Sequence, residues 1–81
     1  IDIEINNNEA YPNPFTDFAT VNFEEEGVWS IYSTSGVLMD TGVSENMKSV
    51  EIGLTLSKGC FILWFTPKFT QNCYSKRIVK L

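Results

Sequence analysis

The side chains available for chemistry in this chain are few, and the most useful type is missing. The 81 residues include no histidine, so a Ser/His/Asp triad, a Cys/His pair and the commonest zinc ligand are all absent. Carboxylates are the remaining candidates for acid and base catalysis: Glu24 and Glu26 on one strand face, with Asp17 before them. No neighbouring group would raise the pKa of one carboxyl and not of the other. The sequence therefore predicts a protein that is not an enzyme.

Metal binding is the next chemistry to consider. Asn6, Asn7, Asn8 and Glu9 offer oxygen ligands that suit calcium, but the alternating ligand positions and the glycine of a calcium-binding loop are missing. A polar connector explains these residues more simply. We therefore expect no metal site and no cofactor.

The two cysteines, Cys60 and Cys73, suggest a disulfide because the chain is small. A hairpin of 60–66 with 72–81 would place Cys73 opposite Phe65 and Cys60 opposite Ile78. The two sulfur atoms would then lie about 17 Å apart, beyond the reach of a disulfide bond. We expect two free thiols.

Length and charge limit the function further. We expect one domain over residues 1–81, with 1–10 as a leading strand or connector, and any export signal outside the chain. The longest apolar run, Cys60 to Phe65, is far shorter than the roughly 20 residues of a transmembrane helix. The net charge is −4, with seven acids and no base in residues 1–27 and four bases and no acid in residues 66–81. Nucleic acid is excluded as a partner by the acidic balance, whereas a protein-docking surface stays open.

Strands must position whatever function the chain has, because apolar residues alternate with polar ones throughout. The runs begin at Ile1, Ala19, Trp29 and Phe61, and turn residues separate them at short intervals. This spacing predicts an all-β fold, an immunoglobulin-like β-sandwich of about seven short antiparallel strands, with a small closed barrel as the alternative. Gly36 should supply the turn of a hairpin over residues 29–39. The predicted core consists of Val21, Phe23, Trp29, Ile31, Leu56, Phe61 and Leu63.

The segment Tyr11-Pro12-Asn13-Pro14-Phe15 restricts the backbone more than any other part of the sequence. Each proline fixes its own φ, removes an amide donor and pushes the preceding residue toward extended geometry. We expect a stiff connector whose two aromatic rings, Tyr11 and Phe15, cover apolar surface.

The order of the motifs along the chain resembles a known family. The segment 11–15 is followed by a strand ending at Phe23, a stretch ending at Gly36, the run 54–63 containing Gly59, and Lys76-Arg77-Ile78-Val79-Lys80 near the end. This series is similar to the type A C-terminal sorting domain of the type IX (Por) secretion system of Bacteroidota. Cys60 and Phe61 depart from the family's usual aliphatic residue and tyrosine, and Leu81 follows a lysine that often ends the chain.

The resemblance implies a non-catalytic secretion signal that follows its cargo in the same polypeptide. Such a signal takes the cargo from the periplasm through the outer-membrane translocon, and a cell-surface sortase then removes it, leaving the cargo on the surface or in the medium. By the matched motif, recognition falls to the five residues Lys76, Arg77, Ile78, Val79 and Lys80. The alternative is that this strand only completes the sheet.

Two other classes of protein stay open. One is a flagellar hook-capping-type immunoglobulin-like module, which shares the opening motif but usually carries a Trp-Asp-Gly segment where this chain has Ile52 to Leu56. The other is an adhesive or carbohydrate-binding sandwich with a stacking platform formed by Trp29, Tyr32, Trp64 or Tyr74. Aromatic rings gathered on one exposed patch would favour the binding module, and buried or scattered rings would favour the sorting signal.

Overall fold

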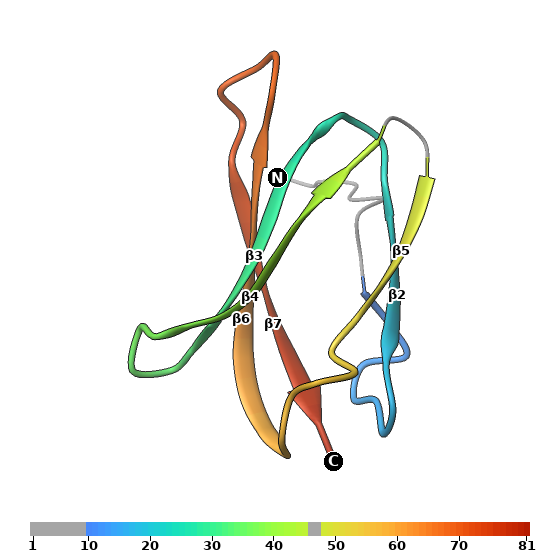
Figure 1. Cartoon of the computed structure of the whole chain (residues 1–81), viewed down its shortest axis with the longest axis vertical. Helices are drawn as coiled ribbons and strands as arrows, with labels where there is room; N and C mark the ends of the chain where they lie inside the picture. Colours follow the sequence, from blue (N-terminus) through green and yellow to red (C-terminus); the bar gives the residue numbers. More distant parts are fainter. Residues whose placement is uncertain (1–9, 46–47) are drawn as a thin grey trace, which may run out of the picture.

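The computed structural model describes residues 10–45 and 48–81 and shows seven strands and no helix in them (Figure 1). The predicted strand at Ile1 and the conceivable calcium ligands at 6–9 lie outside the described residues. The strands are β1 (Ala10–Tyr11), β2 (Ala19–Phe23), β3 (Gly27–Ser33), β4 (Leu38–Ser44), β5 (Lys48–Ile52), β6 (Gly59–Pro67) and β7 (Tyr74–Lys80).

The strands form two antiparallel sheets that pack face to face as a sandwich (Figure 1). One sheet has the order β1-β2-β5, and the other has the order β4-β3-β6-β7. The run Cys60 to Phe65 lies in β6, an inner strand of the larger sheet, where Phe61, Leu63 and Phe65 face the core and Cys60, Ile62 and Trp64 face outward. The prediction of an immunoglobulin-like sandwich is confirmed.

The core lies between the sheets, and every residue predicted for it is buried. The ring of Phe23 on β2 stacks on that of Phe65 on β6, with centroids 4.7 Å apart, and so joins the two sheets. Six further buried hydrophobic residues lie outside the core set predicted from alternation: Ala10, Phe15, Ala19, Ile52, Phe65 and Ile78.

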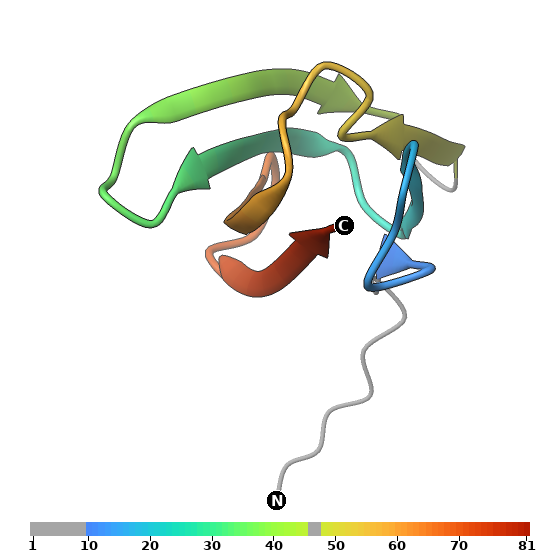
Figure 2. The same ribbon diagram turned by 90° about the horizontal axis from the view of Figure 1, so that it is seen from below.

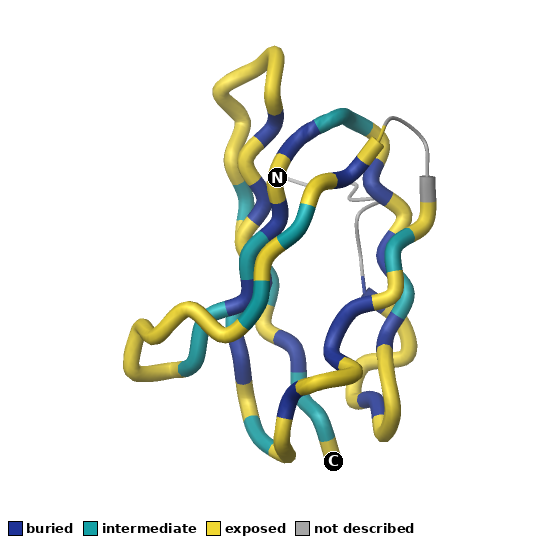
Figure 3. The backbone as a smooth tube through the Cα atoms, in the orientation of Figure 1, coloured by how far each residue is buried: buried dark blue, intermediate teal, exposed yellow. Residues whose placement is uncertain are grey.

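The predicted hairpin at Gly36 is present between β3 and β4, where Gly36 has a φ of +91°. The amide of Gly36 donates to the carbonyl of Ser33 over 2.9 Å and closes the turn. Figure 3 shows that this turn, between β3 and β4 at the lower left, is exposed and projects from the body.

The register predicted for the last hairpin is wrong by one residue. Phe61 faces Ile78, and Cys60 faces Val79. The sandwich requires this register because Ile78 and Phe61 are both buried, and a slip of one residue would turn Ile78 to the outside. The prediction of two free thiols is confirmed all the same, since Cys60 and Cys73 are both free and exposed.

Candidate functional site

Strand β7 divides the five predicted recognition residues between its two faces. Ile78 is buried in the core, and Lys76 and Lys80 lie on the same inward side because strand side chains alternate. Arg77 and Val79 point outward, where Arg77 is exposed. The structure therefore does not bring the three cations Lys76, Arg77 and Lys80 together on one face.

The ammonium group of Lys80 makes its hydrogen bonds to backbone carbonyl groups. Its Nζ donates to the carbonyl oxygens of Gly53 at 2.7 Å, Leu56 at 2.8 Å and Leu54 at 3.4 Å. The same ammonium lies 5.9 Å from the centroid of the Phe15 ring, at the distance of a cation–π contact. This cation therefore ties the last strand to the loop before β6, and a serine at this position would remove all of these contacts.

The segment Tyr11 to Phe15 lies against the free edge of β7, beside the C-terminus (Figure 2). The side-chain amide of Asn13 donates to the carbonyl of Arg77 over 2.9 Å, and its Oδ1 accepts from the amide of Val79 over 3.0 Å. Phe15 continues the ladder: its amide donates to the carbonyl of Val79 over 2.9 Å, and its carbonyl accepts from the amide of Leu81 over 2.8 Å. We call residues 11–15 the edge strap.

The residue types of the edge strap follow from this geometry. Asn13 presents one donor and one acceptor, as a peptide group of a neighbouring strand would. The prolines on either side have no amide that would be left unpaired. Phe15 is buried, but Tyr11 is exposed and accepts a hydrogen bond from Asn22 at 3.0 Å, so only one of the two rings covers the core as expected. The strap therefore occupies the backbone at the edge of the C-terminal half of β7, which leaves no room there for another strand.

Glycines shape the loop that receives Lys80. Gly53 has a φ of +92°, and a Cβ there would lie 2.5 Å from the ring of Phe15. Gly59, which the motif singled out, begins β6 with a φ of +146° and faces Lys80. Gly53 was missed, although a glycine directly after the alternating run that ends at Ile52 was the available signal.

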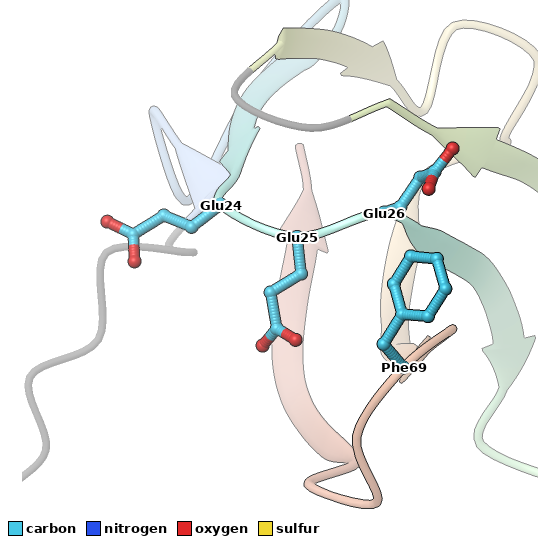
Figure 4. A pocket seen from close by; sticks show the side chains of 4 residues that line it. All are labelled: Glu24, Glu25, Glu26 and Phe69. Atoms are coloured by element: carbon cyan, nitrogen blue, oxygen red, sulfur yellow. The ribbon is translucent and has the colours of Figure 1, made fainter.

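The glutamates do not form a catalytic pair. Glu24, Glu25 and Glu26 line a hollow with Phe69, but they lie in the turn between β2 and β3, and their carboxylates point in different directions (Figure 4). The expectation that Glu24 and Glu26 share a strand face is wrong for that reason. Thr70 donates to Glu25 at 3.3 Å.

Tyr74 lies half-buried below this turn, and its ring packs against Phe65 with centroids 5.4 Å apart. Burial, and then the negative charges of Glu25 and Glu24, raise the pKa of the Tyr74 hydroxyl well above its ordinary value. A phenol that is held neutral in this way is not a base at neutral pH.

In the described ranges, no group of three His, Cys, Asp or Glu side chains is arranged to hold a metal ion. No helix that is long and apolar enough to cross a membrane occurs in the same part of the chain. Of the four aromatic residues that could form a stacking platform, Trp29 is buried and Tyr74 is half-buried. Tyr32 and Trp64 lie on one outward face, on the neighbouring strands β3 and β6.

Comparison with known proteins gives one match. A family model described as the secretion system C-terminal sorting domain matches residues 9–80. No curated protein and no solved structure matches the chain significantly. The matched range contains the edge strap, both sheets and the hydrogen bonds from Lys80 to the loop Gly53 to Leu56, which we call the clasp around Lys80. The family's sequence pattern therefore spans the entire sandwich. The chain belongs to the family of C-terminal sorting domains, the secretion signals of the type IX system.

Proposed function

We propose that this domain carries a cargo, joined to it in one polypeptide, across the outer membrane of a Bacteroidota cell through the type IX translocon. A sortase then removes the domain, and the cargo stays at the surface or enters the medium. The observation that supports this proposal most is the family match over residues 9–80, which ends on the terminal motif.

The arrangement of side chains supports a signal rather than an enzyme. The carboxylates of the β2–β3 turn diverge, and the raised pKa of the Tyr74 hydroxyl holds this group in its neutral form. A polypeptide signal needs only a stable surface that a partner can recognise.

Recognition by the residues of the terminal motif is part of the proposal. Arg77 and Val79 are the members that a partner can contact, since they point outward from β7. Lys80 and Ile78 contribute by fixing the strand, through the loop carbonyls and the core respectively.

The proposal is tested by placing the 81 residues at the C-terminus of a fluorescent protein that is exported to the periplasm of a Bacteroidota host. We expect fluorescence at the cell surface or in the medium. The fluorescent product recovered there should be smaller than the intact fusion by most of the mass of the domain. Retention of the intact fusion in the periplasm would contradict the proposal. A reporter that leaves the cell with the whole domain attached would remove the sortase step alone.

A further inference from the structure

The outward face of the four-stranded sheet carries a set of apolar side chains, with Ser30, Thr41, Thr66 and Ser75 as small polar residues among them. We define the apolar face by Val28 and Tyr32 on β3, Val43 on β4, Ile62 and Trp64 on β6, and Val79 on β7. Val28 pairs with Val43, and Tyr32 pairs with Ile62, so these side chains stand next to one another across the strands. Val43 is 71% exposed, Val28 45% and Trp64 42%. These side chains cover a surface that stays in contact with water in the isolated domain.

The other sheet shows that this composition is not a general property of the sandwich. Its outward positions on β2 and β5 are polar: Thr20 faces Glu51, and Asn22 faces Ser49, whose hydroxyl donates to it. An antiparallel sheet with one solvated face normally alternates in this way. The smaller sheet follows the rule and the larger one departs from it, which indicates that the larger sheet is covered by a partner.

Arg77 supplies the charge of this surface. It pairs with Ile62 across β6 and β7, and it is the one charged side chain among the described outward positions of the four strands. A guanidinium covered by an apolar partner must meet a carboxylate, because an unpaired buried charge is costly.

We propose that the apolar face is the surface by which a protein of the secretion machinery recognises this domain, and that the partner presents apolar side chains around a carboxylate that binds Arg77. The inference rests on the proposed function and assigns its contact surface. Recognition then extends over β4, β3, β6 and β7 instead of being limited to the terminal motif.

A second copy of the chain fits this surface poorly. Two domains packed face to face would bury two arginines, and neither copy brings a carboxylate from the described positions of that face. The occupant is therefore a different protein with an acidic group.

The experiment compares substitutions on the apolar face with matched ones elsewhere, in the fusion with the exported fluorescent protein. Arg77→Glu and Trp64→Thr should each lower export about tenfold, as expected for central residues of an interface. Arg77→Lys should stay within about threefold of the unchanged domain, because the charge is kept. Glu51→Lys, a charge reversal on the polar sheet, and Phe69→Thr, which removes an exposed ring from the β6–β7 turn, should leave export unchanged.

Circular dichroism of each purified variant checks the fold, and Arg77→Glu keeps the test decisive if Trp64→Thr does not fold. Normal export of folded Arg77→Glu would overturn the docking surface and the recognition role of Arg77, and would leave the proposed export function intact. Failure of the unchanged fusion to leave the periplasm would overturn both. A dimer in analytical sedimentation that is lost in Trp64→Thr would assign the face to self-association. Slower migration of the domain in a native gel containing soluble xylan or laminarin, if lost in the same variant, would assign the face to carbohydrate binding. Either result overturns the proposal.

Discussion

Lys80 is the residue that fastens the last strand to the rest of the sandwich. Its ammonium donates hydrogen bonds to three carbonyl groups of the loop from Gly53 to Leu56. A hydrogen bond to a charged group contributes about 1.5–3 kcal/mol to the free energy of unfolding. Lys80→Met keeps the aliphatic stem and removes the donors, so it should lower the free energy of unfolding by about that amount in a urea titration. Arg77→Met, which changes an exposed residue three positions before Lys80 on the opposite face of β7, is the control and should change the free energy of unfolding by less than about 0.5 kcal/mol. Equal effects of the two substitutions would show that Lys80 is an ordinary surface charge.

Substitutions at Gly36 and Gly53 distinguish the energetic cost of a positive φ from the cost of a steric clash. Both have a positive φ near +90°, but a Cβ at Gly36 would meet nothing within 4 Å, whereas one at Gly53 would collide with Phe15. Gly36→Ala should cost about 1–2 kcal/mol for the left-handed backbone alone. Gly53→Ala should cost more, since overpacking adds about 1–3 kcal/mol. Thermal melts of the two variants test this difference, and a larger loss for Gly36→Ala would contradict the packing of Phe15 on the loop.

Tyr74 predicts an alkaline limit to stability. Its folded pKa is raised by burial and by Glu25 and Glu24, so its contribution is complete below the unfolded pKa of about 10 and is lost as pH rises above that value. The hydroxyl has no hydrogen-bond partner in the described structure, and Tyr74→Phe should therefore retain the stability of the domain at pH 7. Between pH 10 and 11.5 the unchanged domain should lose stability more steeply than the variant. Parallel curves of urea midpoint against pH would show that Tyr74 ionises freely.

At the scale of the elements, the edge strap decides which backbone groups of β7 are open. The amide of Val79 donates to Asn13, whereas the amide of Ile78 points to β6 because alternate residues of a strand face opposite neighbours. Asn13→Ala should raise the hydrogen-exchange rate of the Val79 amide about tenfold and leave that of Ile78 unchanged. Asn13→Asp keeps the acceptor for Val79 and should retain most of its protection. Unchanged exchange at Val79 in Asn13→Ala would show that the strap does not cover the edge.

The elements also show what the sequence could and could not predict. Alternation located β2, β3 and β6 and identified inward residues such as Phe23 and Leu63, because a period of two leaves a clear signal. Alternation alone did not place Phe15 and Ile78 in the core, because their burial depends on contacts between segments more than 60 residues apart, such as Asn13 with Arg77. The same reason explains Lys80: a basic residue near the end of a strand suggests solvent exposure, and only the loop from Gly53 to Leu56 shows otherwise.

At the scale of the molecule, the sandwich has two different outer surfaces. The smaller sheet is polar outside, and the larger one carries the apolar face with Arg77. The clasp around Lys80 and the edge strap hold β7, which contributes Val79 and Arg77 to that face. The proposed docking surface therefore requires the signal to be recognised as a folded sandwich rather than as a short terminal peptide.

The measurement that tests the central claim most directly is the ratio of reporter outside the cell to reporter in the periplasm, for a fusion carrying only these 81 residues. It is taken in two otherwise identical Bacteroidota hosts, one with an intact type IX translocon and one without it. A secretion signal predicts a high ratio in the intact host and a ratio near that of the untagged reporter in the other. Equal ratios in the two hosts would contradict the assignment of this domain as a type IX sorting signal.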